Sequence, residues 1–172
     1  MRVAVDVSAA RGRRGERGAA AVEAALVICF IVLPLVFGII AYAYMLSFRQ
    51  SLSQAATEGA RAAAVLYTSD TGAARAAGQQ QAAQRAVNNA LSSFGVTCDA
   101  TLGTLRRNGE AVGSCQVSVL TAGSAGCDSA AHNCMQVNLN YLYRDHTLLP
   151  TVPGLGFTLP GDLGYSATAE VS

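Results

Sequence analysis

The chain has 172 residues, of which 51% are hydrophobic and only 13% are charged. The charged share is about half of what a soluble domain usually carries, and all twelve basic residues are arginines. A net charge of +1 gives no reason to expect nucleic-acid binding, and the composition excludes a fully soluble, evenly patterned globule.

The first predicted elements are a basic leader and a membrane helix. Five arginines lie in residues 1–18, whereas residues 24–48 contain no charge. This apolar stretch of 25 residues exceeds the ~20 that a helix needs to span a bilayer. Because the arginines precede it, the N-terminus is expected inside and the C-terminus outside. Pro34 removes one backbone amide and is expected to loosen or kink the helix near mid-membrane.

The apolar stretch fits a secretory signal or a plain anchor only in part. A removable secretory signal has an apolar core of about 7–15 residues, which this stretch exceeds, although residues 41–43 offer a small-x-small cleavage site. A plain single-pass anchor accounts for length and orientation but not for Glu23 at the edge of the apolar stretch, where a carboxylate is costly unless paired or functional. In isolation, Glu23 is interpreted as a solvated carboxylate at a helix N-terminus.

Two sequence motifs favour a third class of membrane protein. Residues 14–26 read RGERGAAAVEAAL, and residues 55–63 read AATEGARAA. With the basic leader before them, these motifs resemble the TadE-like family, which are minor pilins, or pseudopilins, of tight-adherence (Flp-type) pilus systems. The resemblance covers about the first third of the chain strongly and the rest loosely.

The resemblance implies that a membrane prepilin peptidase cuts between Gly18 and Ala19. Glu23 would then be the fifth residue of the mature chain, and Gly18, without a Cβ, suits an extended segment in a peptidase cleft. The new amine of Ala19 and Glu23 are expected to neutralise one another between neighbouring subunits of a filament. The implied partners are the peptidase, the major pilin, other minor pilins, the platform proteins of the assembly machine and the membrane; no nucleic acid and no cofactor are expected.

A helical pattern continues beyond the membrane segment, so that residues 20–67 would form a rod of about 70 Å. Small residues recur every fourth position along it, which lets helices approach closely: Ala55, Gly59 and Ala63. This track packs either on the chain's own head or on another subunit. Glu58 and Arg61 are expected to pair across one turn.

A second helix is predicted at residues 73–94, ended by Gly95, with residues 79–81 (QQQ) on its solvated face. From Val96 the periodicity becomes alternating. Asn108-Gly109 predicts a hairpin between residues 100–107 and 110–113. Further strands are predicted at residues 115–121, 134–143 and 163–171. The head is therefore expected to be a small antiparallel sheet leaning on one or two helices.

Four cysteines fall in the segment expected outside, where disulfides persist: Cys98, Cys115, Cys127 and Cys134. Four cysteines allow three connectivities. We favour Cys98–Cys115, which ties the first hairpin, and Cys127–Cys134, which closes a short loop. A zinc site at Cys127, His132 and Cys134 is the alternative, but the spacing matches no usual zinc pattern, and no metal is expected. Cys29, inside the apolar helix, is interpreted as a small packing residue.

No catalytic residues are expected, because Asp145-His146 is not accompanied by a nucleophile motif.

The predicted fold is α+β and pilin-like: a long N-terminal transmembrane and stalk helix, a second helix and a small disulfide-bonded sheet. The expected segments are a leader (1–18), a transmembrane helix (19–48), a helical stalk with the second helix (49–95) and an extracytoplasmic head (96–172). The predicted function is that of a structural minor pilin, not an enzyme, that helps to initiate pilus assembly. The alternative is an unprocessed single-pass envelope protein with a disulfide-stabilised binding or scaffold domain.

Overall fold

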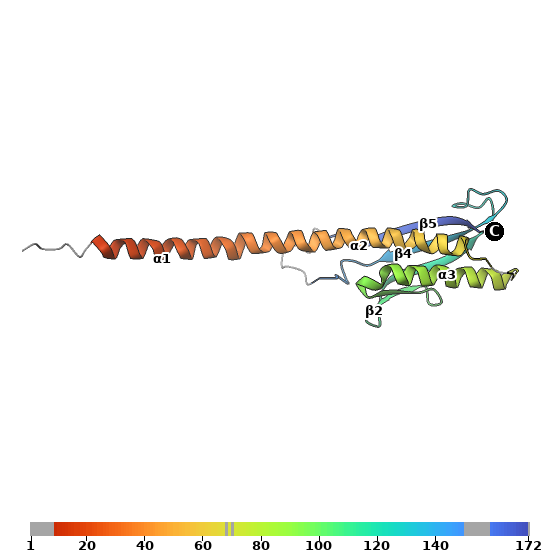
Figure 1. Cartoon of the computed structure of the whole chain (residues 1–172), viewed down its shortest axis with the longest axis horizontal. Coiled ribbons are helices and arrows are strands. Elements are labelled where there is room, and N and C mark those ends of the chain that lie inside the picture. Colours follow the sequence, from red (N-terminus) through yellow and green to blue (C-terminus); the bar gives the residue numbers. More distant parts are fainter. Residues whose placement is uncertain (1–8, 68, 70, 150–158, 172) are drawn as a thin grey trace, which may run out of the picture. The chain divides into compact units, whose positions relative to one another are not determined.

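The computed structural model describes residues 9–67, 69, 71–149 and 159–171, with side chains from residue 18 onward (Figure 1). Residues 1–8 of the expected leader lie outside the described part. The chain divides into two compact units, Met1–Tyr42 and Ala43–Ser172. Each unit is described by itself below.

The first unit is helical throughout its described residues. Helix α1 (Ala9–Val27) is followed by a π-helical turn, η1 (Ile28–Val32), and by the first part of α2 (Leu33–Ala64). In the π-turn the Leu33 amide donates to the Ile28 carbonyl, one residue further back than in an α-helix. The turn ends two residues before Pro34, whose ring has no N–H and clashes with a regular α-helical carbonyl. The loosening expected at Pro34 therefore takes the form of a π-turn.

The second unit combines the rest of α2 with a second helix and an antiparallel sheet, as the sequence predicts. Its helices after α2 are α3 (Ala73–Leu91) and the short 3₁₀ turn η2 (Ser92–Phe94). Its strands are β1 (Val96–Asp99), β2 (Thr104–Arg107), β3 (Glu110–Leu120), β4 (Asn133–Tyr141) and β5 (Leu163–Val171). The five strands lie in chain order and are all antiparallel, so the sheet is a meander. The predicted α+β fold is confirmed.

One hydrophobic core joins both helices of this unit to one face of the sheet (Figure 1). Alternate residues of β4, the strand with the clearest predicted period, point into this core: Met135, Val137, Leu139 and Tyr141. Phe48 of α2 is fully buried and meets Phe94 and Tyr141 edge-on, with ring centroids 4.9 and 4.8 Å apart. Such edge-to-face pairs add to the free energy gained by burial alone.

The opposite face of the sheet is mainly polar. Its cross-strand pairs include Gln116 with Asn138 and Asn138 with Ser166. An antiparallel sheet with one apolar and one polar face is expected to pack on helices on one side only. This pattern explains why both α2 and α3 lie on the same face.

The turn before β2 differs from the prediction of one strand over residues 100–107. The strand β1 ends at Asp99, and the Asp99 carboxylate accepts hydrogen bonds from the amides of Thr101 and Leu102, each 3.1 Å away. This side chain competes with strand pairing for the local backbone amides and turns the chain. Strand β1, which the sequence prediction missed, is short because this turn ends it.

Other boundaries follow from local residues. Asn108 and Gly109 both have positive φ, 51° and 84°, as a tight primed hairpin turn requires. Gly95 adopts the left-handed conformation (φ 66°) that ends the second helical segment. The prediction that residues 79–81 are solvated is wrong for Gln79, which is 3% exposed. Gln79 lies one helical turn before the buried Ala83, on the face of α3 that packs on the head.

Candidate processing and assembly sites

The expected cleavage position lies within helix α1. Gly18 and Ala19 are exposed, and a Cβ built on Gly18 would meet no atom within 4 Å. A peptidase needs an extended backbone, so cleavage at the expected position would require the helix to unwind locally. The glycines at positions 12, 15 and 18 favour this, because each lowers helix stability by about 1 kcal/mol relative to alanine.

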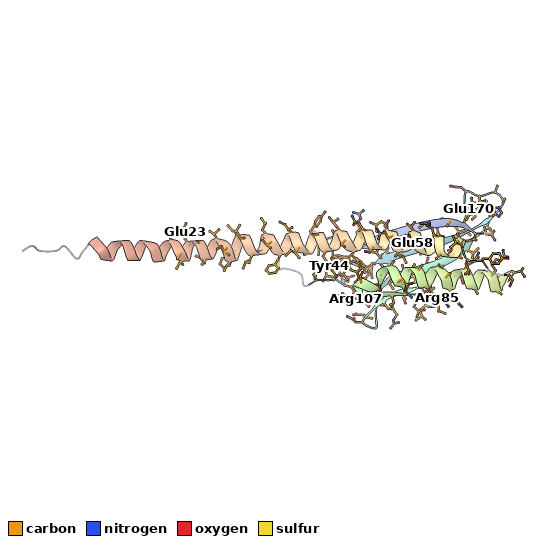
Figure 2. All side chains as sticks on the ribbon, viewed as in Figure 1. Glu23, Tyr44, Glu58, Arg85, Arg107 and Glu170 are labelled. Carbon is orange, nitrogen blue, oxygen red and sulfur yellow. A yellow bond between two sulfur atoms is a disulfide. The ribbon has the colours of Figure 1, made fainter. Side chains whose placement is uncertain are left out.

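Glu23 lies on the same helix, four residues after Ala19, and is exposed (Figure 2). Residues four apart share one face of a helix and differ by about 6 Å along its axis. The neighbours of Glu23 on α1 are apolar and also exposed, with 61% of Val22 and 53% of Leu26 accessible. The structure thus places a carboxylate among apolar side chains, on the part of α1 that follows the basic residues.

The apolar stretch of residues 24–48 meets two different surroundings. In the first unit its large side chains are exposed, Phe30 to 75%. Met45 and Phe48, in contrast, belong to the core of the second unit, and Tyr44 packs edge-on against Phe94. Residues 24–43 remain for the hydrocarbon of a membrane, about 30 Å of helix, which matches the thickness of the bilayer core.

The described residues contain one helical segment, Gly18–Ala64, that is long and apolar enough to cross a membrane. No residue in the most apolar part of this segment is buried within the structure. Exposed apolar surface of this extent requires a lipid or protein neighbour. Gly18–Ala64 is therefore a candidate membrane span.

The small-residue track of α2 is used inside the head. Ala55, Gly59 and Ala63 are buried, and a Cβ on Gly59 would lie 2.8 Å from Val87 Cγ2 and 3.3 Å from Val137 Cγ2. Glycine at position 59 thus permits α2 to approach both α3 and β4. Of the two predicted uses of this track, the structure contains packing on the chain's own head.

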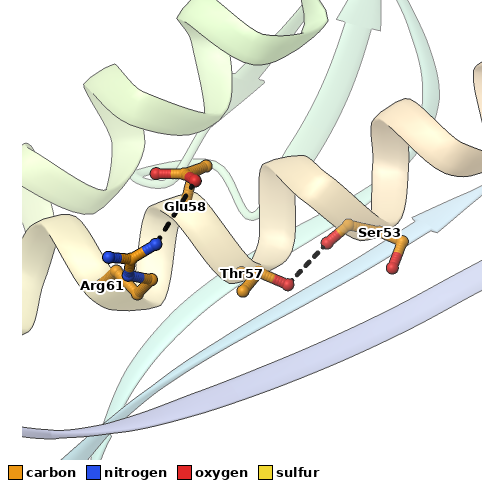
Figure 3. Close-up of polar contacts among 4 residues, drawn as sticks. All are labelled: Ser53, Thr57, Glu58 and Arg61. Carbon is orange, nitrogen blue, oxygen red and sulfur yellow. Dashed lines mark hydrogen bonds and ion pairs between the residues drawn. The ribbon is translucent and has the colours of Figure 1, made fainter.

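Glu58 and Arg61 lie on the exposed side of α2, away from the buried track of small residues (Figure 3). Arg61 Nη1 is 3.8 Å from Glu58 Oε1, and the two side chains are 70% and 60% exposed. The predicted ion pair is present, but an exposed pair at this distance contributes little to stability. Close by, the Thr57 hydroxyl donates to the Ser53 carbonyl at 2.9 Å.

Two disulfides join the four cysteines of the head in the favoured pairs. Cys98–Cys115 connects β1 to β3 with a Cα–Cα distance of 5.7 Å, and Cys127–Cys134 closes the loop before β4 at 5.6 Å. Because the sulfurs of Cys127 and Cys134 are bonded to each other, they are not available as the zinc ligands of the alternative interpretation. Within the described residues, no group of three His, Cys, Asp or Glu side chains could hold a metal ion. Cys29 is exposed and not in a disulfide, so the packing role expected of it is not fulfilled within the described structure.

The loop after β4 is held by two side chains that sequence reasoning did not single out. The Tyr141 hydroxyl donates to the His146 carbonyl at 2.8 Å, and the Arg107 guanidinium donates to the Thr147 carbonyl at 3.3 Å. Burial raises the pKa of Tyr141 above its usual range, as it does that of Tyr143. His146 takes part in these contacts through its backbone: its carbonyl accepts from Tyr141, and its amide donates to the Leu142 carbonyl at 3.1 Å. The buried face predicted for β4 indicated Tyr141, but no local motif indicated Arg107.

Comparison with known proteins finds one family that matches part of the chain. Residues 18–61 match the family described as TadE-like protein. No curated protein and no solved structure matches the chain. The matched segment begins at Gly18 and includes Glu23 and the Glu58–Arg61 pair. The resemblance inferred from the residues is therefore confirmed over residues 18–61, and this match supports an association with Tad pilus systems.

Proposed function

We propose that the chain is a structural minor pilin, or pseudopilin, that helps to initiate a Tad-type pilus or a related secretion filament. The observation that carries this proposal is the TadE-like match over residues 18–61. It coincides with an exposed apolar helix whose later residues enter the core of a disulfide-bonded head. A plain envelope anchor requires the exposed helix but not the acidic residue within it.

Prepilin peptidase is the proposed processing enzyme, and the bond between Gly18 and Ala19 is its proposed target. The arginines of residues 1–18 hold this bond at the inner membrane surface, where anionic lipid attracts them. The head then lies outside, in keeping with its two disulfides. Cleavage removes the basic leader and frees the amine of Ala19.

Glu23 has a proposed role after processing. A carboxylate in an apolar bundle is costly unless an opposite charge compensates it. The amine of Ala19 on a neighbouring subunit supplies that charge. The neighbours are the major pilin or other minor pilins, brought together by the platform proteins of the assembly machine.

The substitution Glu23→Ala tests this role. Membrane insertion and processing of the full chain should persist, because an apolar helix inserts at least as well without the carboxylate. Incorporation into filaments should fall strongly, as measured by immunoblotting of sheared pili against the membrane fraction. Glu16→Ala is the matched control, since it removes an equal charge from the leader that the peptidase discards, and its filaments should be normal. Unchanged incorporation of the Glu23→Ala chain would contradict the role of Glu23 and favour the simple anchor.

A further inference from the structure

We propose that a cavity of the head binds the headgroup of a membrane phospholipid that carries a primary amine. Arg49 holds the phosphate of this headgroup, and Asp162 holds its ammonium group. The inference goes beyond the proposed function, because it needs the membrane span but neither processing nor a filament. It assigns a ligand to the second unit itself.

The cavity lies within the second unit, between α2 and the start of β5. Its volume is about 170 Å³. Met45 and Arg49 of α2 form one part of its wall, and residues 160 and 162–165 form the rest. The exposure of Asp162 leaves the cavity open to solvent. A site for a drug-sized ligand has at least ~300 Å³, so this cavity suits a headgroup and not a whole lipid.

The place of Arg49 in the chain brings the cavity to the level of lipid headgroups. Arg49 directly follows the uncharged stretch of residues 24–48 and lies six residues after Ala43, where the hydrocarbon of the membrane is expected to end. Six residues of helix span about 9 Å, and the headgroup layer beside the hydrocarbon is roughly 5–8 Å thick. Side chains of a helix lean toward its N-terminus, and a long arginine side chain reaches back across this difference.

The wall of the cavity changes from apolar to charged along α2. Met45, one helical turn nearer to the membrane than Arg49, is 4% exposed and belongs to the hydrophobic core. Arg49 brings the positive charge at the next turn. A phospholipid has the same order, because its glycerol and acyl chains lie on the membrane side of its phosphate.

Arg49 is ordered by an aromatic residue of β5. Its Nε–H donates to the Tyr165 hydroxyl, and its guanidinium carbon lies 6.0 Å from the centroid of the Tyr165 ring. Neither contact neutralises the positive charge, since a phenol and an aromatic ring are uncharged partners. A guanidinium carries five N–H donors and can hold more than one acceptor at once, with a geometry that matches phosphate oxygens.

Asp162 supplies the negative charge of the same cavity. Its Oδ2 accepts a hydrogen bond from Asn140 Nδ2 at 3.2 Å. A carboxylate has about four lone-pair positions, so this contact orients Asp162 and leaves it able to accept from an ammonium group. A primary ammonium brings three N–H donors, whereas the quaternary ammonium of choline brings none. The carboxylate therefore favours a primary amine.

The two opposite charges identify the class of lipid. A headgroup with a phosphate and a primary amine, as in phosphatidylethanolamine, complements both Arg49 and Asp162. Phosphatidylglycerol offers the phosphate but leaves Asp162 without a positive partner in the ligand. We therefore commit to the zwitterionic lipid with a primary amine, and the other headgroups serve as comparisons in the test.

The test is native mass spectrometry of the full chain in detergent, titrated with phosphatidylethanolamine, phosphatidylcholine or phosphatidylglycerol of identical acyl chains. The variants are Arg49→Gln and Asp162→Asn. Arg85→Gln and Asp128→Asn are the matched controls, because both residues are exposed charges of the head outside the cavity wall. Thermal unfolding, followed by near-UV circular dichroism, establishes that each variant is folded.

The unsubstituted chain and both controls should bind phosphatidylethanolamine about tenfold more tightly than the other two lipids, as expected for one additional charge-assisted hydrogen bond. Asp162→Asn should abolish this preference, and Arg49→Gln should weaken binding of all three lipids. If Arg49→Gln unfolds the head, the result for the exposed Asp162 decides alone.

Equal affinity of the unsubstituted chain for the three lipids would overturn the proposal, as would a preference that survives Asp162→Asn. Soluble phosphoethanolamine is the last probe. If it bound as tightly as the lipid, the membrane would be overturned as the source of the headgroup. Each of these failures would leave processing at Gly18 and the role of Glu23 standing, because neither depends on the cavity.

Discussion

Two glycines of the head differ in how much they can tolerate a side chain. A Cβ on Gly113 would lie 2.0 Å from the Asn140 carbonyl oxygen, whereas a Cβ on Gly59 would meet the Val87 side chain at 2.8 Å. Backbone atoms of a paired strand cannot move away without breaking the ladder between β3 and β4. A valine side chain can shift by a few tenths of an ångström.

We therefore expect Gly113→Ala to destabilise the head by about 3 kcal/mol and Gly59→Ala by about 1–2 kcal/mol, within the range seen for overpacked sites. The measurement is thermal unfolding of the full chain in detergent, followed by near-UV circular dichroism. Gly161→Ala is the control, because nothing lies within 4 Å of its Cβ and its φ is not in the positive range. A larger loss at Gly59 than at Gly113 would contradict the described pairing of β3 with β4.

The buried tyrosines predict an alkaline limit to stability. Burial raises the pKa of Tyr141 and Tyr143 in the folded head above the unfolded value near 10. A raised folded pKa means that the contribution of the neutral tyrosines is complete below pH 10 and is lost as the pH rises through the folded pKa. The melting temperature should therefore be insensitive to these groups at pH 7–9 and fall above pH 10.

Replacing both Tyr141 and Tyr143 by Phe should flatten this alkaline decline. At neutral pH the double variant should lose about 1 kcal/mol, since Tyr141 gives up its bond to the His146 carbonyl. Tyr67→Phe is the control, because Tyr67 is 96% exposed. Melting curves between pH 7 and 11 would refute the role of these tyrosines if the double variant declined as steeply as the unsubstituted chain.

At the scale of elements, the two disulfides constrain the head differently. Cys98–Cys115 spans 17 residues and joins β1 to β3, whereas Cys127–Cys134 spans 7 residues within one loop. Chain-entropy arguments assign about 3 kcal/mol to the longer loop and about 2 kcal/mol to the shorter one. The double substitution Cys98→Ala with Cys115→Ala should therefore lower the melting temperature more than the corresponding change at Cys127 and Cys134. The reverse order would indicate that the loop before β4, and not the sheet, limits stability.

Elements with strong local signals could be predicted from the sequence. The alternation in β4, the Asn108-Gly109 turn and the left-handed Gly95 each depend on neighbouring residues only, and the structure contains all three. Strand β1 was missed because the side chain of Asp99 ends it after four residues, too few for a clear period. The burial of Gln79 was missed because it depends on how α3 packs on the head, which no local pattern encodes.

The candidate sites also divide into residues with a local sequence signal and residues whose role depends on packing in the folded chain. Gly18, Ala19 and Glu23 are candidates because of a linear signal: a basic leader, a glycine and an acid at fixed spacing. The use of Ala55, Gly59 and Ala63 within the head could not be decided in advance, because a small-residue track serves either its own fold or a partner. The support that Arg107 gives to the loop after β4 joins residues forty apart, so only the folded chain reveals it.

At the scale of the whole molecule, one stretch of apolar sequence faces two surroundings. Its earlier residues are exposed in the first unit, and its last residues are buried in the head. Glu23 is the charged residue at the N-terminal edge of this apolar stretch. The proposed function depends on whether cleavage after Gly18 frees the amine of Ala19, four residues before Glu23.

The most direct measurement is the intact mass and N-terminal residue of the protein extracted from its native membrane, with and without the prepilin peptidase. The account predicts a chain that begins at Ala19 when the peptidase is present and retains the leader when it is absent. A chain that retains the leader in both cases would contradict processing and favour an ordinary anchor. A chain that begins directly after Ala43 would show that the apolar stretch is a secretory signal and not a membrane helix.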